Sequence, residues 1–165
     1  MNKYEFTGET EFWLGRTLRQ IRAKISFGIV KAGEVGGWIE KEGNLSDDGN
    51  AWVYGDARVY GDARVCGGAR VCGDARVYGN AQVCGDAQVY KQSHFLCIGP
   101  IGSRFDFATF FRTKNYEIYV KCGCFRGNIK EFAKKVSVTR GDSIYAKQYM
   151  AAIDTAKAHI DLTQE

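Results

Sequence analysis

Proline, histidine and long apolar runs are scarce in this chain of 165 residues, which has one proline, two histidines and 20 glycines. Glycine without proline indicates tight turns at regular intervals and argues against a Pro-rich linker. No apolar run approaches the ~20 residues that span a bilayer, and the N-terminus lacks a charged-then-apolar signal pattern. We therefore expect a cytoplasmic protein without a membrane partner, whose six cysteines are reduced thiols.

The positive charge is small and lies mainly in the C-terminal part of the chain. The formal net charge is +4, and residues 93–165 carry eleven Lys and Arg against seven Asp and Glu. This excess favours a small anionic ligand there. It is too weak to predict direct binding to nucleic acid from electrostatics alone.

A six-residue repeat occupies residues 51–92 and dominates the sequence. Its seven consecutive units read AWVYGD, ARVYGD, ARVCGG, ARVCGD, ARVYGN, AQVCGD and AQVYKQ. Ala-x-Val is a short strand whose first and third side chains face the same way, and Gly-Asp supplies a turn. Three units make a triangular coil of about 18 residues that stacks on the next coil. The pattern resembles the left-handed parallel β-helix of bacterial acyltransferases, and the left hand comes from that resemblance alone.

Stacked coils place residues 18 positions apart next to each other, so the outward-facing ladders can be predicted. Tyr60 should lie over Tyr78 and Arg58 over Arg76, while Trp52 lies on a further face and Cys66 over Cys84 could reach disulfide distance. In a cytoplasmic protein we expect this last pair to be reduced. About 2.3 coils need partners at their faces or ends. We therefore predict a homotrimer whose interface includes Trp52, Arg58, Tyr60, Arg76 and Tyr78.

The solenoid is predicted to lie between two other parts of the chain. Residues 1–50 read as a strand-rich capping segment with an irregular first coil. Residues 93–165 read as a small α+β domain in which alternating strands precede two helices. Asn128 and Glu131 form an N-x-x-E capping signature for the first helix, and Asp142 is the expected N-cap of the second. The fold class is thus mainly β, with a β-helix followed by an α+β domain.

Residues suited to catalysis or metal binding are few. His94 follows the last coil and is the one candidate general base, whereas His159 lies near the end of the last helix. The Cys122-Gly123-Cys124 pair lacks the second pair that a four-ligand zinc site needs, so we expect no metal. We predict no cofactor and no catalytic residue.

A candidate ligand site begins in the stretch GPIGSR, residues 99–104. A glycine-rich bend that ends in Ser103 and Arg104 offers backbone N–H groups and a guanidinium to an anion. Thr109, Arg112 and Lys121 lie on the adjoining predicted strands. If these five residues converge, they form a cationic pocket for a phosphate-bearing ligand. The alternative is a surface loop with dispersed charges.

The two ends of the chain together carry a wider resemblance. The strings YEFTGET…GGWIEKEGNLS and GPIGSR…TFFRTK…CGCFRG…GDSIYAKQY resemble hexapeptide-repeat proteins of bacteriophages, prophages and gut bacteria. Relatives tend to have His-Gly-Asp in place of Arg140-Gly141-Asp142, and a more polar run at residues 105–108. The resemblance implies a phage accessory protein in the bacterial cytoplasm. Our hypothesis is a non-catalytic trimer that sequesters a nucleotide-type immune signal. The alternatives are an acyltransferase-like enzyme and a structural or protein-docking oligomer.

Overall fold

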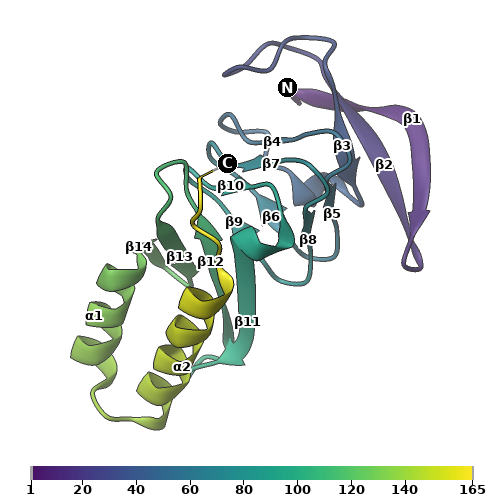
Figure 1. Ribbon diagram of the computed structural model, residues 1–165. Coiled ribbons are helices and arrows are strands. Elements are labelled where there is room, and N and C mark those ends of the chain that lie inside the picture. Colours follow the sequence, from purple (N-terminus) through teal and green to yellow (C-terminus); the bar gives the residue numbers. More distant parts are fainter. Residues whose placement is uncertain (1, 165) are drawn as a thin grey trace.

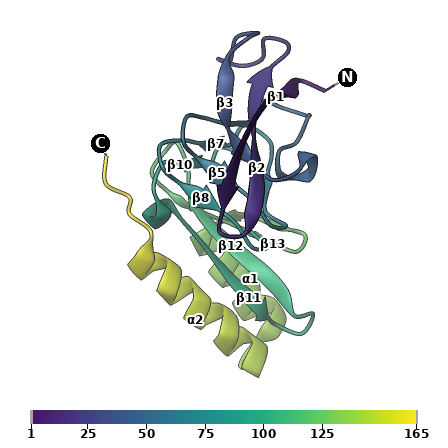
Figure 2. The same cartoon turned by 90° about the vertical axis from the view of Figure 1, so that its right-hand side faces the viewer.

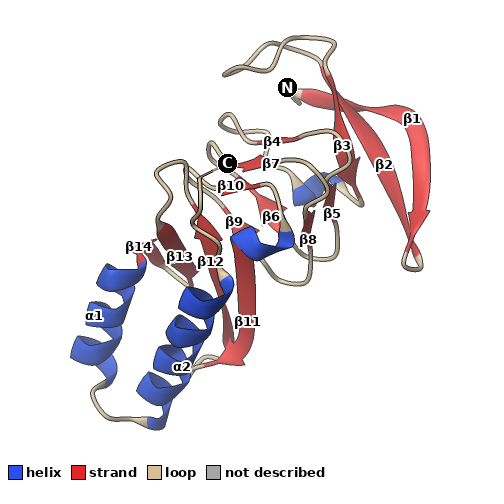
Figure 3. Cartoon of the chain, in the orientation of Figure 1, coloured by secondary structure: helices blue, strands red, loops and turns tan. Residues whose placement is uncertain are grey.

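The computed structural model describes residues 2–164 and shows three parts arranged in chain order (Figure 1). A long antiparallel hairpin comes first, followed by a solenoid of short strands and then by a sheet covered by two helices (Figure 3). The hairpin consists of β1 (Tyr4–Trp13) and β2 (Arg16–Ala23), and β2 pairs with β3 (Val35–Ile39). The protein is therefore mainly β, as the sequence predicts.

The six-residue repeats form two-residue strands that pair in parallel with strands one coil away. These strands are β4 (Trp52–Val53), β5 (Arg58–Val59), β6 (Arg64–Val65), β7 (Arg70–Val71), β8 (Arg76–Val77), β9 (Gln82–Val83) and β10 (Gln88–Val89). The register pairs Arg58 with Arg76 and Val59 with Val77, a step of 18 residues. The repeat valines and almost all of its alanines are fully buried inside the coils. The predicted stacking and the predicted inward face are both confirmed.

The backbone hydrogen bonds that flank each strand pair run in one direction from coil to coil among the described residues. The backbone N–H groups of an earlier coil donate to carbonyl groups of the next coil, as in Arg58 to Ala75 (3.0 Å), Arg64 to Ala81 (2.9 Å) and Arg70 to Ala87 (2.9 Å). At the first coil the flanking carbonyl acceptors consequently lack a coil beneath them. At the last coil the flanking N–H donors lack a coil above them. These flanking groups therefore need opposite kinds of cap at the two ends of the solenoid.

Donor side chains cover the N-terminal end. The buried Lys3 ammonium donates to the carbonyl groups of Ala51 (2.9 Å) and Gly49 (3.3 Å), and it lies 4.8 Å from the centroid of the Phe27 ring. The Tyr4 hydroxyl donates to the carbonyl of Glu42 at 3.1 Å. Burial lowers the pKa of Lys3 to about 8, because desolvation outweighs the attraction of nearby carboxylates.

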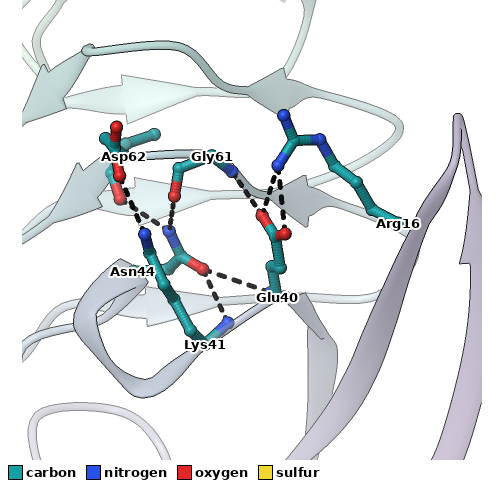
Figure 4. Close-up of polar contacts among 7 residues, drawn as sticks. Arg16, Glu40, Lys41, Asn44, Gly61 and Asp62 are labelled. Atoms are coloured by element: carbon teal, nitrogen blue, oxygen red, sulfur yellow. Dashed lines mark hydrogen bonds and ion pairs between the residues drawn. The ribbon is translucent and has the colours of Figure 1, made fainter.

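A buried asparagine supplies further donors at a corner of the first coil (Figure 4). Asn44 ends a short 3-10 helix, Glu42–Asn44, and its amide Nδ2 donates to the carbonyl groups of Gly61 (3.1 Å) and Ala63 (2.8 Å). Its Oδ1 accepts from the N–H of Glu40 (3.2 Å) and of Lys41 (2.9 Å). The four contacts use both the nitrogen and the oxygen of the amide. The side chain therefore fixes the corner and caps the coil above it.

The C-terminal part is a four-stranded antiparallel sheet that carries two helices on one face (Figure 2). Its elements are β11 (Phe95–Ile101), β12 (Asp106–Arg112), β13 (Ile118–Cys122), β14 (Phe125–Asn128), α1 (Ile129–Arg140) and α2 (Ile144–His159). The predicted capping box is confirmed, since Asn128 Oδ1 accepts from the Glu131 N–H at 2.8 Å. The N-cap of α2 is Ser143, one residue after the predicted Asp142, and its hydroxyl accepts from the Ala146 N–H.

Acceptor side chains cover the C-terminal end of the solenoid. The Thr109 hydroxyl on β12 accepts from the N–H of Gln82 at 2.9 Å, and the Gln92 amide oxygen accepts from the N–H of Arg76. His94 Nδ1 accepts from the N–H groups of Tyr90 (3.0 Å) and Lys91 (3.2 Å). The C-terminal sheet is thus joined to the last coil by hydrogen bonds as well as by packing.

Two hydrophobic cores lie on opposite faces of the C-terminal sheet. Phe111 and Phe95 pack with the solenoid valines, in the core that also takes in Tyr4 and Ile21 of the N-terminal part. Phe110 and Ala108 pack with the helices. The alternation of side chains along β12 therefore assigns one face to each core.

We predict that Asn44→Ala lowers the free energy of unfolding by about 2–4 kcal/mol, because it leaves two N–H donors and two carbonyl acceptors at a buried corner without partners. Urea denaturation measures the change. Asn80→Ala, at an exposed turn of the same solenoid, is the control and should shift stability by less than about 0.5 kcal/mol. Equal effects of the two substitutions would contradict the capping role of Asn44.

The lowered pKa of Lys3 predicts a pH dependence of stability. The folded pKa of about 8 lies below the unfolded value of 10.5, so the unfolded chain binds more protons between these pH values and stability rises with pH in that window. The unfolding free energy of the wild type relative to Lys3→Met should increase between pH 7 and pH 10, by on the order of 2–3 kcal/mol. Lys24→Met, at an exposed site, should give no such trend in chemical denaturation across the same pH range.

Candidate functional site

The five residues of the sequence-predicted ligand site do not converge on one pocket. Ser103 and Arg104 are exposed in the turn between β11 and β12, whereas Thr109 and Arg112 are buried on β12. Lys121 lies on β13, opposite Thr109 in the register, and donates to the carbonyl of Gly123. Only Arg104 of the five lines the basic hollow described below.

Thr109 and Arg112 have structural roles. Thr109 caps the last coil through its hydroxyl. Arg112 stacks over the rings of Tyr90 (5.4 Å) and Tyr116 (5.5 Å), and its Nε donates to the carbonyl of Gln88 at 3.4 Å. Both side chains thus join β12 to the solenoid, and their hydrogen-bonding groups are directed at protein atoms.

A shallow hollow of about 330 Å³ lies in the C-terminal domain, and basic side chains line it. Arg104 reaches it from the β11–β12 turn, and α1 contributes Lys135 and Arg140. The remaining lining residues are Asp106, Cys122, Gly123, Cys124, Phe125, Thr139 and Tyr149. Three cations against one carboxylate give the charged lining an excess of two positive charges. We call this feature the basic hollow.

Local structure positions the backbone that carries two of the cations of the basic hollow, Arg104 and Arg140. The N–H of Gly102 donates to the amide oxygen of Gln148 on α2 at 2.7 Å, which ties the Arg104 turn to that helix. Gly102 has a φ of +78°, and a Cβ there would lie 2.0 Å from the Tyr149 hydroxyl. Arg140 lies in the last turn of α1, where a cation also complements the partial negative charge of the helix terminus.

Two lining residues of the basic hollow, Cys122 and Tyr149, are uncharged at pH 7. Burial raises the pKa of the Cys122 thiol and, likewise, the pKa of the Tyr149 phenol, so both groups keep their protons. Lys135 Nζ lies 5.7 Å from the centroid of the Phe125 ring, which places a cation beside an aromatic face. The arrangement offers charge from the rim and apolar surface from the floor.

The sequence did not reveal Lys135 or Arg140 as candidates. Both lie on the exposed side of a helix where basic residues at such spacing are ordinary, and nothing in the sequence brings them to Arg104. Their contribution depends on the packing of α1 beside the β11–β12 turn. Gly102 of GPIGSR was the one local signal of the site. Only glycine fits at this position, because a Cβ would collide with Tyr149.

The predicted interface residues lie in different environments. Trp52 is 0% exposed, packed edge-on against Phe27 and Tyr4 of the same chain, so its prediction as an interface residue is wrong. The physical reason is that the N-terminal segment folds over this face of the solenoid. Tyr60 is stacked on Tyr78, with ring centroids 5.4 Å apart, and only Tyr78 remains exposed, at 48%.

The β1–β2 hairpin also covers the arginine ladder. The Arg58 guanidinium donates to both Glu11 oxygens, at 2.6 and 3.0 Å, and the Trp13 ring lies against Arg58 (4.2 Å) and Arg76 (4.9 Å). Arg58 is therefore paired within its own chain, and its place in an interface stays a prediction. Arg76, the other residue of the arginine ladder, stays exposed.

His94 is not placed as a general base. It is fully buried, and its Nδ1 accepts from two backbone N–H groups at the end of the solenoid. A lone pair in this arrangement is directed at the protein backbone and away from solvent. His159 Nε2 lies 3.0 Å from the carbonyl of Phe95 and 3.1 Å from that of Gln92, joining α2 to the start of β11.

Among residues 2–164, no cluster of three or more His, Cys, Asp or Glu side chains is arranged to hold a metal ion. Cys122 is buried and Cys124 is exposed, on either side of the β13–β14 turn. Cys66 and Cys84 are joined by a disulfide, with Cα atoms 4.6 Å apart, where we expected reduced thiols. Outward-facing neighbours in adjacent coils are close enough for this bond.

Comparison with known proteins agrees with the repeat. A family model described as the YdcK beta solenoid repeat matches residues 51–67 and 69–85. No curated protein matches the chain. Neither α1 nor α2 is long and apolar enough to cross a membrane, and the same holds for every helix in the described part of the chain. The parallel coils and the match to the repeat model agree. The chain is therefore a repeat β-solenoid protein.

Proposed function

We propose that this chain is a non-catalytic binding protein whose basic hollow takes a small anionic ligand of the nucleotide type. One observation carries the proposal: Arg104, Lys135 and Arg140 come from separate places in the sequence to line one hollow that contains a single carboxylate, Asp106. The solenoid serves as the scaffold, and its cap at β12 fixes the domain that holds the site.

The chemistry of the hollow suits a phosphate joined to an apolar group. Guanidinium groups bind phosphate oxygens through paired, charge-assisted hydrogen bonds, and Arg104 and Arg140 can each provide such a pair. The aromatic ring of Phe125 supplies a face on which a base can stack. The volume of about 330 Å³ is at the lower end of the range for small-molecule sites.

The biological setting of the proposal comes from the resemblance to phage and prophage hexapeptide proteins. We propose a phage accessory protein that acts in the bacterial cytoplasm and sequesters a nucleotide-type immune signal. A protein that binds without turnover removes its ligand in proportion to its own concentration. We also propose that the solenoid winds left-handed, as the same resemblance implies.

We further propose that the protein is a homotrimer. Phe12 (77% exposed) and Leu14 (72%) lie at the tip of the β1–β2 hairpin, and Tyr78 (48%) lies on the solenoid. Large exposed apolar side chains of this kind are available to an interface between chains. Trp52 takes no part in it, because Tyr4 and Phe27 cover its ring.

The ligand proposal predicts micromolar or tighter binding of at least one member of a panel of cyclic and linear nucleotide messengers in isothermal titration calorimetry. Arg104→Ala and Arg140→Ala should each weaken the binding by about tenfold or more, because each removes a charge-assisted contact. Lys147→Ala, an exposed cation on α2 that does not line the hollow, is the matched control. A panel without any binding, or equal losses in all three variants, would sink the proposal.

The trimer proposal predicts three times the chain mass in light scattering coupled to gel filtration. Phe12→Glu combined with Tyr78→Glu should shift the protein to monomers, since it places charges at two exposed apolar positions. Val138→Glu, at an exposed position of α1, is the control and should leave the mass unchanged. A wild type that runs as a monomer would overturn the proposal.

A further inference from the structure

A second and larger hollow, of about 600 Å³, lies along the solenoid face that carries the disulfide. Cys66 and Cys84 both line it, beside Arg64 and Gln82 from the same two coils. Arg126 enters from β14, and the other lining residues are Ser46, Asp48, Gly49, Gly67 and Gly85. None of these residues lines the basic hollow, so the two features are separate.

The disulfide is accessible from one of its two ends. Cys66 is half-buried, whereas Cys84 is only 5% exposed. Both side chains face outward, because each lies two residues after the outward-facing residue of its strand, Arg64 or Gln82. A small thiol that enters the hollow therefore meets the Cys66 sulfur first.

The charges around Cys66 favour an anionic attacker. Arg64 precedes Cys66 by two positions on the same outward face, a spacing of roughly 7 Å along a strand. Arg126 adds a second exposed cation from the opposite wall, and Asp48 is the one carboxylate in the lining. Two cations against one anion raise the local concentration of a negatively charged thiol and stabilise a thiolate that forms at Cys66.

The three free cysteines that are buried or half-buried are poorly suited to the same chemistry. Burial raises the pKa of Cys72 to about 11, and burial likewise raises the pKa of the Cys97 and Cys122 thiols. A thiol with a raised pKa carries little thiolate at neutral pH, and thiolate is the reactive form. The Cys66–Cys84 pair is thus the one that this face offers to a thiol from solution.

We propose that this hollow is a thiol–disulfide exchange site for a small thiol that carries carboxylates, of the glutathione class. The thiolate attacks Cys66 Sγ, the Cys66–Cys84 bond breaks, and a mixed disulfide forms at Cys66 while the Cys84 thiolate takes a proton from water. A second thiolate then attacks the sulfur of the bound thiol. This step releases the oxidised disulfide of the small thiol and leaves Cys66 reduced, so two electrons pass to the protein in all.

The test compares how fast three thiols open the disulfide in the full-length native protein: glutathione, which is anionic, neutral 2-mercaptoethanol and cationic cysteamine. Each rate is divided by the concentration of thiolate present, and alkylation with mass spectrometry follows the free cysteines. The rate should be highest for glutathione. Added NaCl should lower the rate for glutathione and raise the rate for cysteamine, because salt screens the charges of the hollow. Peptide mapping should place the transient mixed disulfide on Cys66.

Arg64→Gln combined with Arg126→Gln should slow glutathione by about three- to tenfold and leave 2-mercaptoethanol unchanged, as expected for the loss of two exposed charges. Arg104→Gln, in the other hollow, should leave all three rates unchanged, so this result is independent of the nucleotide proposal. The proposal is overturned if the double variant slows all three thiols equally, or if the disulfide opens only at denaturant concentrations that unfold the chain.

Discussion

The polarity of the hydrogen bonds that flank the strand pairs is the constraint on which the rest of the structure depends. Because these flanking N–H groups donate from each described coil to the next, the solenoid begins with flanking acceptors and ends with flanking donors that have no neighbouring coil. Solvent-exposed strand edges of this kind invite pairing with other chains. The chain meets the first need with Lys3 and Asn44, which donate, and the second with Thr109 and Gln92, which accept. Each cap matches the polarity of its end.

This arrangement links the flanking parts to the solenoid in different ways. The N-terminal hairpin extends a solenoid sheet through β3 and folds its tip over the arginine ladder, so it both caps and covers. The C-terminal sheet instead offers one face to the last coil and the other to its own helices. The capping residue Thr109 and the core residue Phe110 are neighbours on β12, so the domain that carries the basic hollow is held in register with the scaffold. Solenoid capping thereby lies on one face of this small sheet, and the basic hollow lies beside the helices on the other.

The two hollows differ in what they offer, and the difference follows from their walls. The basic hollow is lined by side chains of α1 and a turn beside the uncharged Cys122 and Tyr149, which suits a reversibly bound anion. The hollow on the solenoid face has a disulfide in its lining, because the six-residue repeat places cysteines one coil apart. The same repeat that makes the coil regular therefore also brings a reactive bond to its surface.

The sequence by itself determined the solenoid, because its signal is local and periodic. Alternation within Ala-x-Val assigns the inward face, Gly-Asp assigns the turns, and the three-unit coil assigns the register of Arg58 on Arg76. The capping box of α1 was equally local. The candidate site was predicted only in part, since Gly102 and Arg104 carried a signal and Lys135 and Arg140 did not.

Tertiary structure alone decided which outward residues remain exposed and which polar groups are free for a ligand. Trp52 and Arg58 look like interface residues in the repeat, yet Phe27 packs on the first and Glu11 of the hairpin pairs with the second. Thr109 and Arg112 look like ligand groups, yet both form hydrogen bonds with backbone groups of the solenoid. Periodicity predicts how a chain pairs with itself at short range. It does not predict which distant segment satisfies the ends, because that depends on the polarity and position of groups brought together only by folding.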